Sequence, residues 1–122
     1  MTYQMTIEEH PTYLHARATG EHSPENVLRF LEDAYAECVK RERRDVLVEV
    51  AFTGPSLDIT SIFGVISQRV GDATKLGKIA YLDVSRRDPS RKEFAANVAQ
   101  NRGVNVRLFW EIEAARRWMT EG

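Results

Sequence analysis

The first forty residues change from an alternating pattern of apolar and polar positions to a helical one. Apolar residues alternate with polar ones over residues 3–7 and again over residues 14–18, which predicts an antiparallel hairpin that ends at Gly20. Residues 23–25 then supply a capping hydroxyl, a proline for the first helical position and an acid for the first turn. Apolar residues recur at helical spacing after them, so a helix should run to the basic residues 40–44.

The segment of residues 46–67 joins the most strand-like run of the chain to a second helix. Residues 46–50 are valine or leucine except for Glu49, which predicts a strand with one well-buried face. Residues 53–55 should end this strand, because proline cannot donate to a ladder and glycine tolerates a positive φ. Any function should lie near this loop.

The second helix should begin with a turn rich in hydroxyl groups. Apolar positions recur at helical spacing from Asp58 onward, and Gly71 is a natural stop. Ser56 or Asp58 would cap the helix, which places Thr60 and Ser61 in its first turn. Free backbone N–H groups and the helix dipole favour a phosphate there. Caps and first turns also collect such residues for structural reasons alone.

The rest of the chain repeats the strand and helix pattern. Residues 78–84 read as a strand, a third helix should start at residues 88–89 and end at Gly103, and residues 104–109 form a last strand. A final helix should span residues 111–120. The order β-β-α-β-α-β-α-β-α predicts an α/β fold with a mixed five-stranded sheet, in which an N-terminal antiparallel hairpin is followed by parallel strands.

The polar residues within these strands indicate that about four helices cover mainly one face of the sheet. Sheets covered on both faces have nearly continuous apolar strands, whereas Glu49, Asn105 and Arg107 interrupt these. The second face would combine them with Leu47 and Phe109, a composition that suits solvent or a partner surface. A weak homodimer through this face is therefore predicted.

Composition limits the classes of protein that the chain can represent. Its 122 residues suffice for a single domain over residues 1–122, and the net charge of −1 provides no basic field for nucleic acid or an anionic membrane. The single cysteine, Cys38, fits a reducing cytoplasm, and its place on an apolar helical stripe predicts a core residue. No run approaches the roughly 20 apolar residues of a membrane span, and we expect no signal peptide.

The three histidines do not form a recognisable metal motif. His10, His15 and His22 lack the i, i+4 helical spacing and have no cysteine cluster beside them. The sequence therefore predicts solvated histidines on a hairpin, no metal and no cofactor.

The carboxyl edge of the sheet offers a candidate anion site. Open parallel sheets bind ligands at this edge, where Thr53 and Gly54 should lie near Asp83 and Arg86. A small phosphotransfer or hydrolytic enzyme using Ser56, Thr60 and Asp83 is one interpretation. The sequence has no Walker motif and no recognisable set of nucleophile, base and orienting residue, so we expect no enzyme.

The element order and the hydroxyls in the first turn of the second helix resemble STAS domains, the family of bacterial anti-sigma-factor antagonists. The closing segment FWEIEAARRWM, residues 109–119, is similar to the usual ending of the SpoIIAA-like branch of that family. The resemblance in element order covers nearly the whole chain. It implies a STAS-like fold and a cytoplasmic regulatory role, and the fold of this branch is also compared with lipid-carrying CRAL-TRIO domains.

In the antagonists, the helix opens with an Asp-Ser-Ser-Gly-Leu-Gly type of motif, and a partner kinase phosphorylates the first serine. Residues 58–65, DITSIFGV, correspond to it. Alignment on Gly64 and Val65 places Thr60 at the acceptor position, whereas alignment on Asp58 places Ile59 there.

The resemblance thus implies a non-enzymatic regulatory or protein-interaction module whose partner is a protein such as a regulatory kinase. Its phosphoacceptor or interaction surface would comprise Ser56, Asp58, Thr60, Ser61 and Phe63. The alternative is a domain that binds a small ligand or lipid through the apolar helix face around Ile62 and Phe63. A deep closed pocket would favour this alternative.

Overall fold

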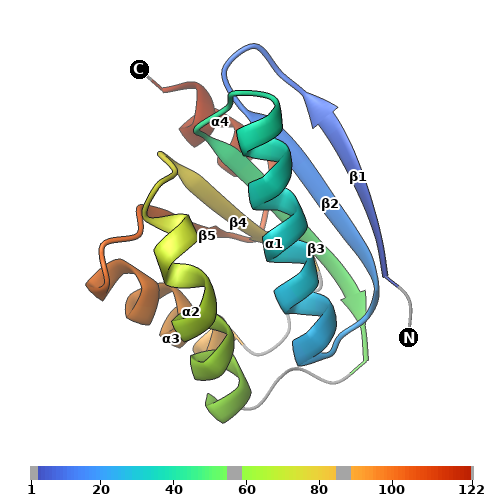
Figure 1. Cartoon of the computed structure of the whole chain (residues 1–122), viewed down its shortest axis with the longest axis vertical. Helices are drawn as coiled ribbons and strands as arrows, with labels where there is room; N and C mark the ends of the chain where they lie inside the picture. Colours follow the sequence, from blue (N-terminus) through green and yellow to red (C-terminus); the bar gives the residue numbers. More distant parts are fainter. Residues whose placement is uncertain (1–2, 55–58, 85–88, 122) are drawn as a thin grey trace.

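The computed structural model describes residues 3–54, 59–84 and 89–121, which form an α/β fold around one mixed sheet (Figure 1). The strands are β1 (Tyr3–Glu9), β2 (Leu14–Glu21), β3 (Val46–Thr53), β4 (Ile79–Asp83) and β5 (Val106–Phe109). The helices are α1 (Pro24–Lys40), α2 (Ile59–Ala73), α3 (Pro89–Asn101) and α4 (Ile112–Thr120). The predicted order of elements is confirmed.

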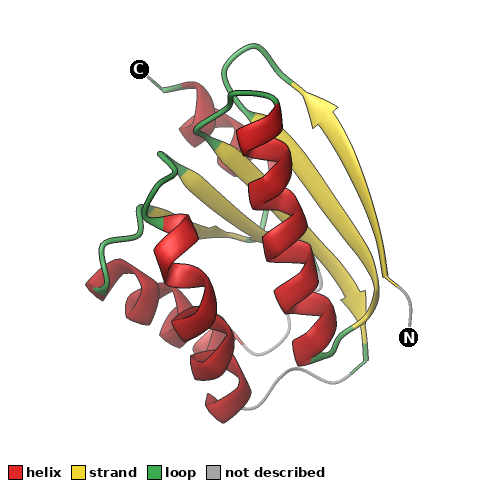
Figure 2. Ribbon diagram, viewed as in Figure 1, coloured by secondary structure: helices red, strands yellow, loops and turns green. Residues whose placement is uncertain are grey.

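The strands lie in the sheet in the same order as in the sequence, β1-β2-β3-β4-β5. β1 and β2 pair antiparallel, and β2, β3, β4 and β5 pair in parallel, as predicted. Each parallel crossover moves to the next strand in the same direction, and such crossovers are right-handed. α1, α2 and α3 therefore lie on the same face of the sheet, and α4 lies behind it (Figure 2).

Local sequence explains the start of α1. The Ser23 hydroxyl accepts a hydrogen bond of 3.1 Å from the Asn26 backbone, and Pro24 occupies the first helical position. The buried Asn26 side chain also donates to the Glu21 carbonyl at 2.8 Å, which fixes the turn from β2 into the helix. The predicted opening of this helix is confirmed.

The end of β3 agrees with the prediction, whereas the end of α2 does not. β3 ends at Thr53, within the predicted break at residues 53–55, and it pairs with β2 as far as Glu21. α2 does not stop at Gly71 but continues to Ala73. Helices commonly end next to a glycine in the left-handed conformation; Gly103, shortly after the end of α3, has such a φ, of +91°, whereas Gly71 does not.

The main core lies between the sheet and the first three helices. Phe30 and Cys38 of α1 are fully buried there against Ala16, Val48 and other residues of the strands. The predicted core position of Cys38 is confirmed. Burial raises the pKa of its thiol to about 11, so it is a protonated packing group at neutral pH.

The second face of the sheet is less open than the sequence predicted. Leu47, expected at a solvent or partner surface, is fully buried beneath α4, where it packs with Ala80, Leu82, Ala115 and Met119. The strand pattern could not reveal this cover, because the face on which α4 lies depends on its contacts with β3, β4 and β5, which are distant in sequence. The rest of the prediction holds, since Glu49 is partly exposed and Arg107 is exposed.

Hydrogen bonds and ring contacts also attach the end of α4 to the sheet. Lys78 Nζ donates to the carbonyl oxygens of Trp118 at 2.9 Å and Glu121 at 2.7 Å. Arg107 and Phe109 of β5 both contact the Trp118 ring, the guanidinium carbon of Arg107 at 5.1 Å and the Phe109 ring at 5.7 Å between centroids. The predicted homodimer would therefore use a face that this helix partly covers, and it stays a prediction.

Within the described ranges, none of the helices combines the length and the apolar character needed to cross a bilayer.

Candidate functional site

A largely apolar cavity of about 170 Å³ lies between the sheet and the three helices α1, α2 and α3. It forms because α2 packs mainly against the helices on either side of it, α1 and α3. The aliphatic side chains that line the cavity come from all three helices and from the strands beneath. They include Leu31, Val48, Val65, Ala96, Ala99 and Val106.

Charged side chains also line this cavity. Arg69, Arg91 and Lys92 contribute cations, against the single acid Asp72 among the described lining residues. Arg69 Nη1 lies 3.2 Å from Asp72 Oδ2 and 3.5 Å from Glu32 Oε2, so its charge is partly offset. The other two cations lie together in the first turn of α3. The lining therefore combines an apolar interior with three cationic side chains, of which Arg69 and Lys92 each have an acidic partner.

Lys92 belongs to a buried polar group at the end of β4. Its Nζ lies 3.2 Å from Asp83 Oδ2 and 5.7 Å from the centre of the Tyr81 ring. The side chains of Lys92 and Asp83 are only 10% and 3% exposed. Tyr81 and Lys92 line the cavity, so this group lies directly beside it.

Burial and proximity set the protonation of this group. Burial raises the pKa of the Tyr81 phenol, which is therefore neutral at physiological pH. Burial by itself would lower the pKa of Lys92, but the neighbouring Tyr81 and Asp83 oxygens outweigh it and the pKa is raised. Lys92 is thus a fixed cation beside the apolar cavity.

The predicted anion edge is only partly assembled. Asp83 is level with Val50 in the parallel register, whereas Thr53 lies further along β3. The Thr53 hydroxyl donates to the Gly20 carbonyl at 3.2 Å, and Gly54 follows it in the turn. Arg86 lies outside the described residues. Of the predicted set, Asp83 is the residue that meets a charged partner near the cavity.

Only part of the surface predicted at the start of α2 is described. The structure describes its backbone from Ile59 onward and only some of its side chains. The helix begins at Ile59, so Thr60 and Ser61 lie in its first turn, as expected. Ser61 is partly buried. Ser56 and Asp58 lie outside the described residues, as do the side chains of Thr60, Ile62 and Phe63.

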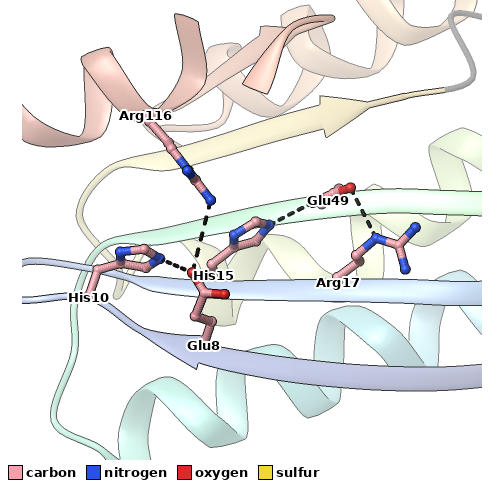
Figure 3. A network of polar contacts seen from close by, with 6 residues as sticks. All are labelled: Glu8, His10, His15, Arg17, Glu49 and Arg116. Carbon is pink, nitrogen blue, oxygen red and sulfur yellow. Dashed lines mark hydrogen bonds and ion pairs between the residues drawn. The ribbon is translucent and has the colours of Figure 1, made fainter. Parts of the chain in front are cut away.

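A second polar cluster lies on the opposite face of the sheet, and the sequence did not predict it. The described residues contain one cluster able to hold a metal ion, formed by Glu8, His10 and His15, which each offer a ligand atom within 4.8 Å of the others. His15 was expected to be solvated but is buried, with 8% of its surface exposed. Figure 3 shows the Glu8 carboxylate between the two imidazoles, with Arg116 approaching from α4.

Glu49 links His15 to a further charge in this cluster. His15 Nε2 lies 2.7 Å from Glu49 Oε1, and Arg17 Nε donates to Glu49 Oε2 at 3.1 Å. The Glu49 side chain is 13% exposed. Its position inside a strand, which signalled a face that is not wholly apolar, is explained by this pairing with two residues of β2.

Spacing rules for helices missed this cluster because it is assembled across strands. Glu8 and His15 are direct partners in the antiparallel register of β1 and β2. Side chains directly opposite in such a pair are close neighbours. The sequence signal that could have found this cluster is the register of the predicted hairpin, which places Glu8 opposite His15.

Comparison with known proteins establishes the fold. No family model matches the chain, and no curated protein matches it. Among solved structures, the chain is similar to an uncharacterized protein of the DUF3478 family with a SpoIIAA-like fold from Shewanella loihica PV-4. The TM-score is 0.59 at 14% identity, and the likeness covers 96% of this chain and 93% of that one. The chain therefore has a SpoIIAA-like fold, as its sequence resemblance predicted.

Proposed function

We propose that this chain is a non-enzymatic binding module that takes the apolar part of a small anionic ligand into the cavity between α1, α2, α3 and the sheet. The observation that carries this proposal is the cavity itself, with its aliphatic interior of about 170 Å³. Binding sites for small molecules are concave, mostly apolar and equipped with a few polar groups. The cavity has each of these properties.

The size of the cavity limits the ligand. An engineered apolar cavity of about 150 Å³ stays dry and binds benzene, so a volume of about 170 Å³ accommodates an aromatic ring or a short aliphatic tail. Burying such a tail is favourable at about 25 cal/mol per Å² of apolar surface.

The charge of the lining favours an anionic head group. Arg91 and Lys92 lie side by side at the start of α3 and both line the cavity. A carboxylate bound there would gain attraction in a site that is partly shielded from water. Medium-chain carboxylates match the apolar interior and the cationic lining together.

Octanoate and 1-octanol are suitable probes because they share a tail and differ in the head group. Isothermal titration calorimetry and two-dimensional NMR should show one octanoate per chain, with shifts concentrated in the helices and strands that line the cavity. Octanol should bind about tenfold or more weakly, a difference of about 1.4 kcal/mol. Arg91→Gln should reduce this preference.

A cavity-filling variant tests where the ligand binds. Ala99→Phe places a ring in the lining and should abolish octanoate binding. Ala36→Phe, at an exposed position of α1, adds the same ring outside the cavity and should bind like the wild type. Equal binding by Ala99→Phe and the wild type would rule out this cavity as the site.

A second candidate function is regulation through a protein partner that contacts the first turn of α2. It is favoured by the SpoIIAA-like fold and by the place of Thr60 and Ser61 at a helix start. A phosphate there would add about −1.5 to −2 charge and accept hydrogen bonds from free N–H groups. Such a change would act on partner binding rather than on folding.

Affinity capture from the native cell would identify the partner, which we expect to be a protein such as a regulatory kinase. Thr60→Glu should weaken the captured association while leaving the melting temperature within a few degrees of the wild type. Gln68→Glu, an exposed position of the same helix, adds the same charge away from the first turn and should not weaken it. Unfolding of Thr60→Glu would instead identify Thr60 as a structural residue.

Catalysis has no part in this proposal. Asp83, the carboxylate with the best position for chemistry, has a lysine ammonium beside it. A screen with phosphatase, esterase and nucleotide substrates, in the presence of Mg²⁺ and Zn²⁺, should show no turnover. Turnover that Asp83→Asn removes would overturn the proposal.

A further inference from the structure

We propose that Glu8, His10 and His15 form a binding site for a divalent transition-metal ion, with Zn²⁺ as the reference ion. The site lies where β1 turns into β2, on the sheet face opposite the cavity, and it is independent of the function proposed above. Nitrogen and oxygen atoms on one Zn²⁺ lie about 2.0–2.2 Å from it. Ligand atoms within 4.8 Å of one another need only small side-chain rotations to reach this geometry.

The backbone already holds two of the ligands side by side. Glu8 and His15 face each other in the ladder between β1 and β2. His10 follows in the connecting turn, where its backbone N–H donates to the Tyr13 carbonyl at 2.9 Å and its ring stacks on the Tyr13 ring at 4.5 Å. The ligands therefore come from a hairpin held by strand pairing, a turn hydrogen bond and ring stacking, and such preorganisation lowers the entropy lost on binding.

The unsatisfied nitrogens of the two imidazoles are the independent sign of a missing ligand. His15 is more than nine-tenths buried, and its Nδ1 makes no hydrogen bond within the described structure. His10 Nε2 lies 2.6 Å from Glu8 Oε1 but not in hydrogen-bonding geometry, so within the described structure it too is a buried atom without a hydrogen bond. Leaving a buried polar atom unpaired costs about 1–3 kcal/mol. A cation between these nitrogens and the carboxylate would satisfy both.

Glu49 completes the arrangement as a positioning residue. Because a carboxylate only accepts hydrogen bonds, His15 donates through Nε2 and presents Nδ1 as the basic nitrogen. Metal-binding histidines commonly donate their second ring N–H to a carboxylate in this way. Arg17 holds the other oxygen of Glu49 at 3.1 Å and so fixes its orientation.

The ligand set indicates which ions should bind. Two imidazoles and one carboxylate suit Zn²⁺, Co²⁺, Ni²⁺ or Cu²⁺, whereas Mg²⁺ and Ca²⁺ prefer oxygen ligands alone. Three protein ligands leave a coordination position for water. Arg116 Nη2, 3.9 Å from Glu8 Oε1, brings a positive charge that opposes a bound cation. Its replacement in Arg116→Gln should therefore tighten binding.

Calorimetric titration of the tag-free protein, treated with chelator and dialysed, tests the site. One Zn²⁺ should bind per chain, Mg²⁺ should not bind, and Zn²⁺ should raise the melting temperature because it binds the folded state. Glu8→Gln and His10→Gln alter residues that are not fully buried, so both variants should fold, and each should weaken Zn²⁺ binding at least tenfold. Glu9→Gln removes the neighbouring exposed carboxylate and is the matched control, with unchanged binding.

Spectroscopy separates a ligand from a residue that only supports the fold. Co²⁺ bound to the wild type should give visible absorption of nitrogen and oxygen coordination, which His10→Gln should abolish. Glu49→Gln should keep the spectrum but bind more weakly, by about 10- to 100-fold, as expected of a positioning residue. Failure of the wild type to bind Zn²⁺ below about 100 μM, or equal binding by Glu8→Gln and Glu9→Gln, would overturn the proposal.

Discussion

The Lys92 ammonium lies 3.2 Å from the Asp83 carboxylate, and together they join the first turn of α3 to the end of β4. No described residue of α3 is fully buried, and this pair is a polar link between the helix and the sheet whose two side chains are nearly buried. Charges removed from water are costly unless paired. The pair therefore acts together with the packing of α3 on α2 and β5 to position this wall of the cavity.

Removal of the cation from this pair should destabilise the fold. Lys92→Met keeps much of the side-chain volume but leaves Asp83 buried without its ammonium, which should cost about 3–5 kcal/mol in urea unfolding followed by circular dichroism. The double variant Lys92→Met/Asp83→Asn should recover part of the loss. Lys40→Met, at an exposed position, should change stability by less than about 0.5 kcal/mol. A similarly small effect for Lys92→Met would contradict the structural role of the pair.

Stability should decline at alkaline pH because of Cys38. Burial raises the pKa of this thiol from 9.0 to about 11, so between these values the unfolded chain loses a proton that the folded chain keeps. The contribution of the buried, protonated thiol to the free energy of unfolding is therefore present below pH 9 and is lost as the pH rises toward 11. The loss should be about 1 kcal/mol at pH 10. Urea midpoints of the wild type and Cys38→Ala at pH 8, 9 and 10 measure it as their difference. A difference that does not change with pH would show that the thiol titrates normally.

Two glycines should respond to alanine in opposite directions. A Cβ at Gly77 would collide with Asp45 Oδ1, which accepts a hydrogen bond of 2.8 Å from the Lys78 backbone. Asp45 must then rotate away, so Gly77→Ala should cost about 1 kcal/mol. A Cβ at Gly71 meets open space inside α2, so Gly71→Ala should add about 0.5–1 kcal/mol.

Double-mutant cycles identify the cause of the Gly77 effect. In an Asp45→Ala background the collision no longer exists, and Gly77→Ala should have little further effect on the free energy of unfolding. Strict additivity of the two changes would place the strain elsewhere in the turn.

Leu47 should behave as a core residue although it faces away from the main core. It is fully buried beneath α4, so Leu47→Ala should lower the free energy of unfolding by about 2–5 kcal/mol. Val39→Ala provides the contrast, because Val39 is 59% exposed and its truncation should be nearly neutral. If the two variants unfolded at the same urea concentration, α4 would not cover this face in solution.

The order of elements could be predicted because each one carries its own periodic pattern. The hairpin, the capped start of α1 and the strands each follow from local rules, and the crossover rule then places three helices on one face. The position of α4 was missed because its choice of face depends on contacts with β3 and β4, distant in sequence. A charged residue such as Glu49 makes its strand face appear exposed to solvent in the sequence, although Leu47 on the same strand is buried beneath α4.

The candidate sites could be predicted only in part. Asp83 was found by its place at the carboxyl edge of β4, but its partner Lys92 lies in a helix that had no reason to be singled out. The cavity depends on how far α2 stands from the sheet, which no local pattern specifies. The cluster of His10 and His15 requires the strand register, since these residues meet across a turn and not along a helix.

The covering of the second face by the last helix has a consequence for protein synthesis. Leu47, Ala80 and Leu82 are made well before α4, the element that buries them. Until its residues leave the ribosome, a nascent chain with a formed sheet presents this apolar surface, and transiently exposed surfaces of this kind promote aggregation. Premature termination before residue 112 should therefore yield chains that collect in inclusion bodies, even where the first three helices can dock.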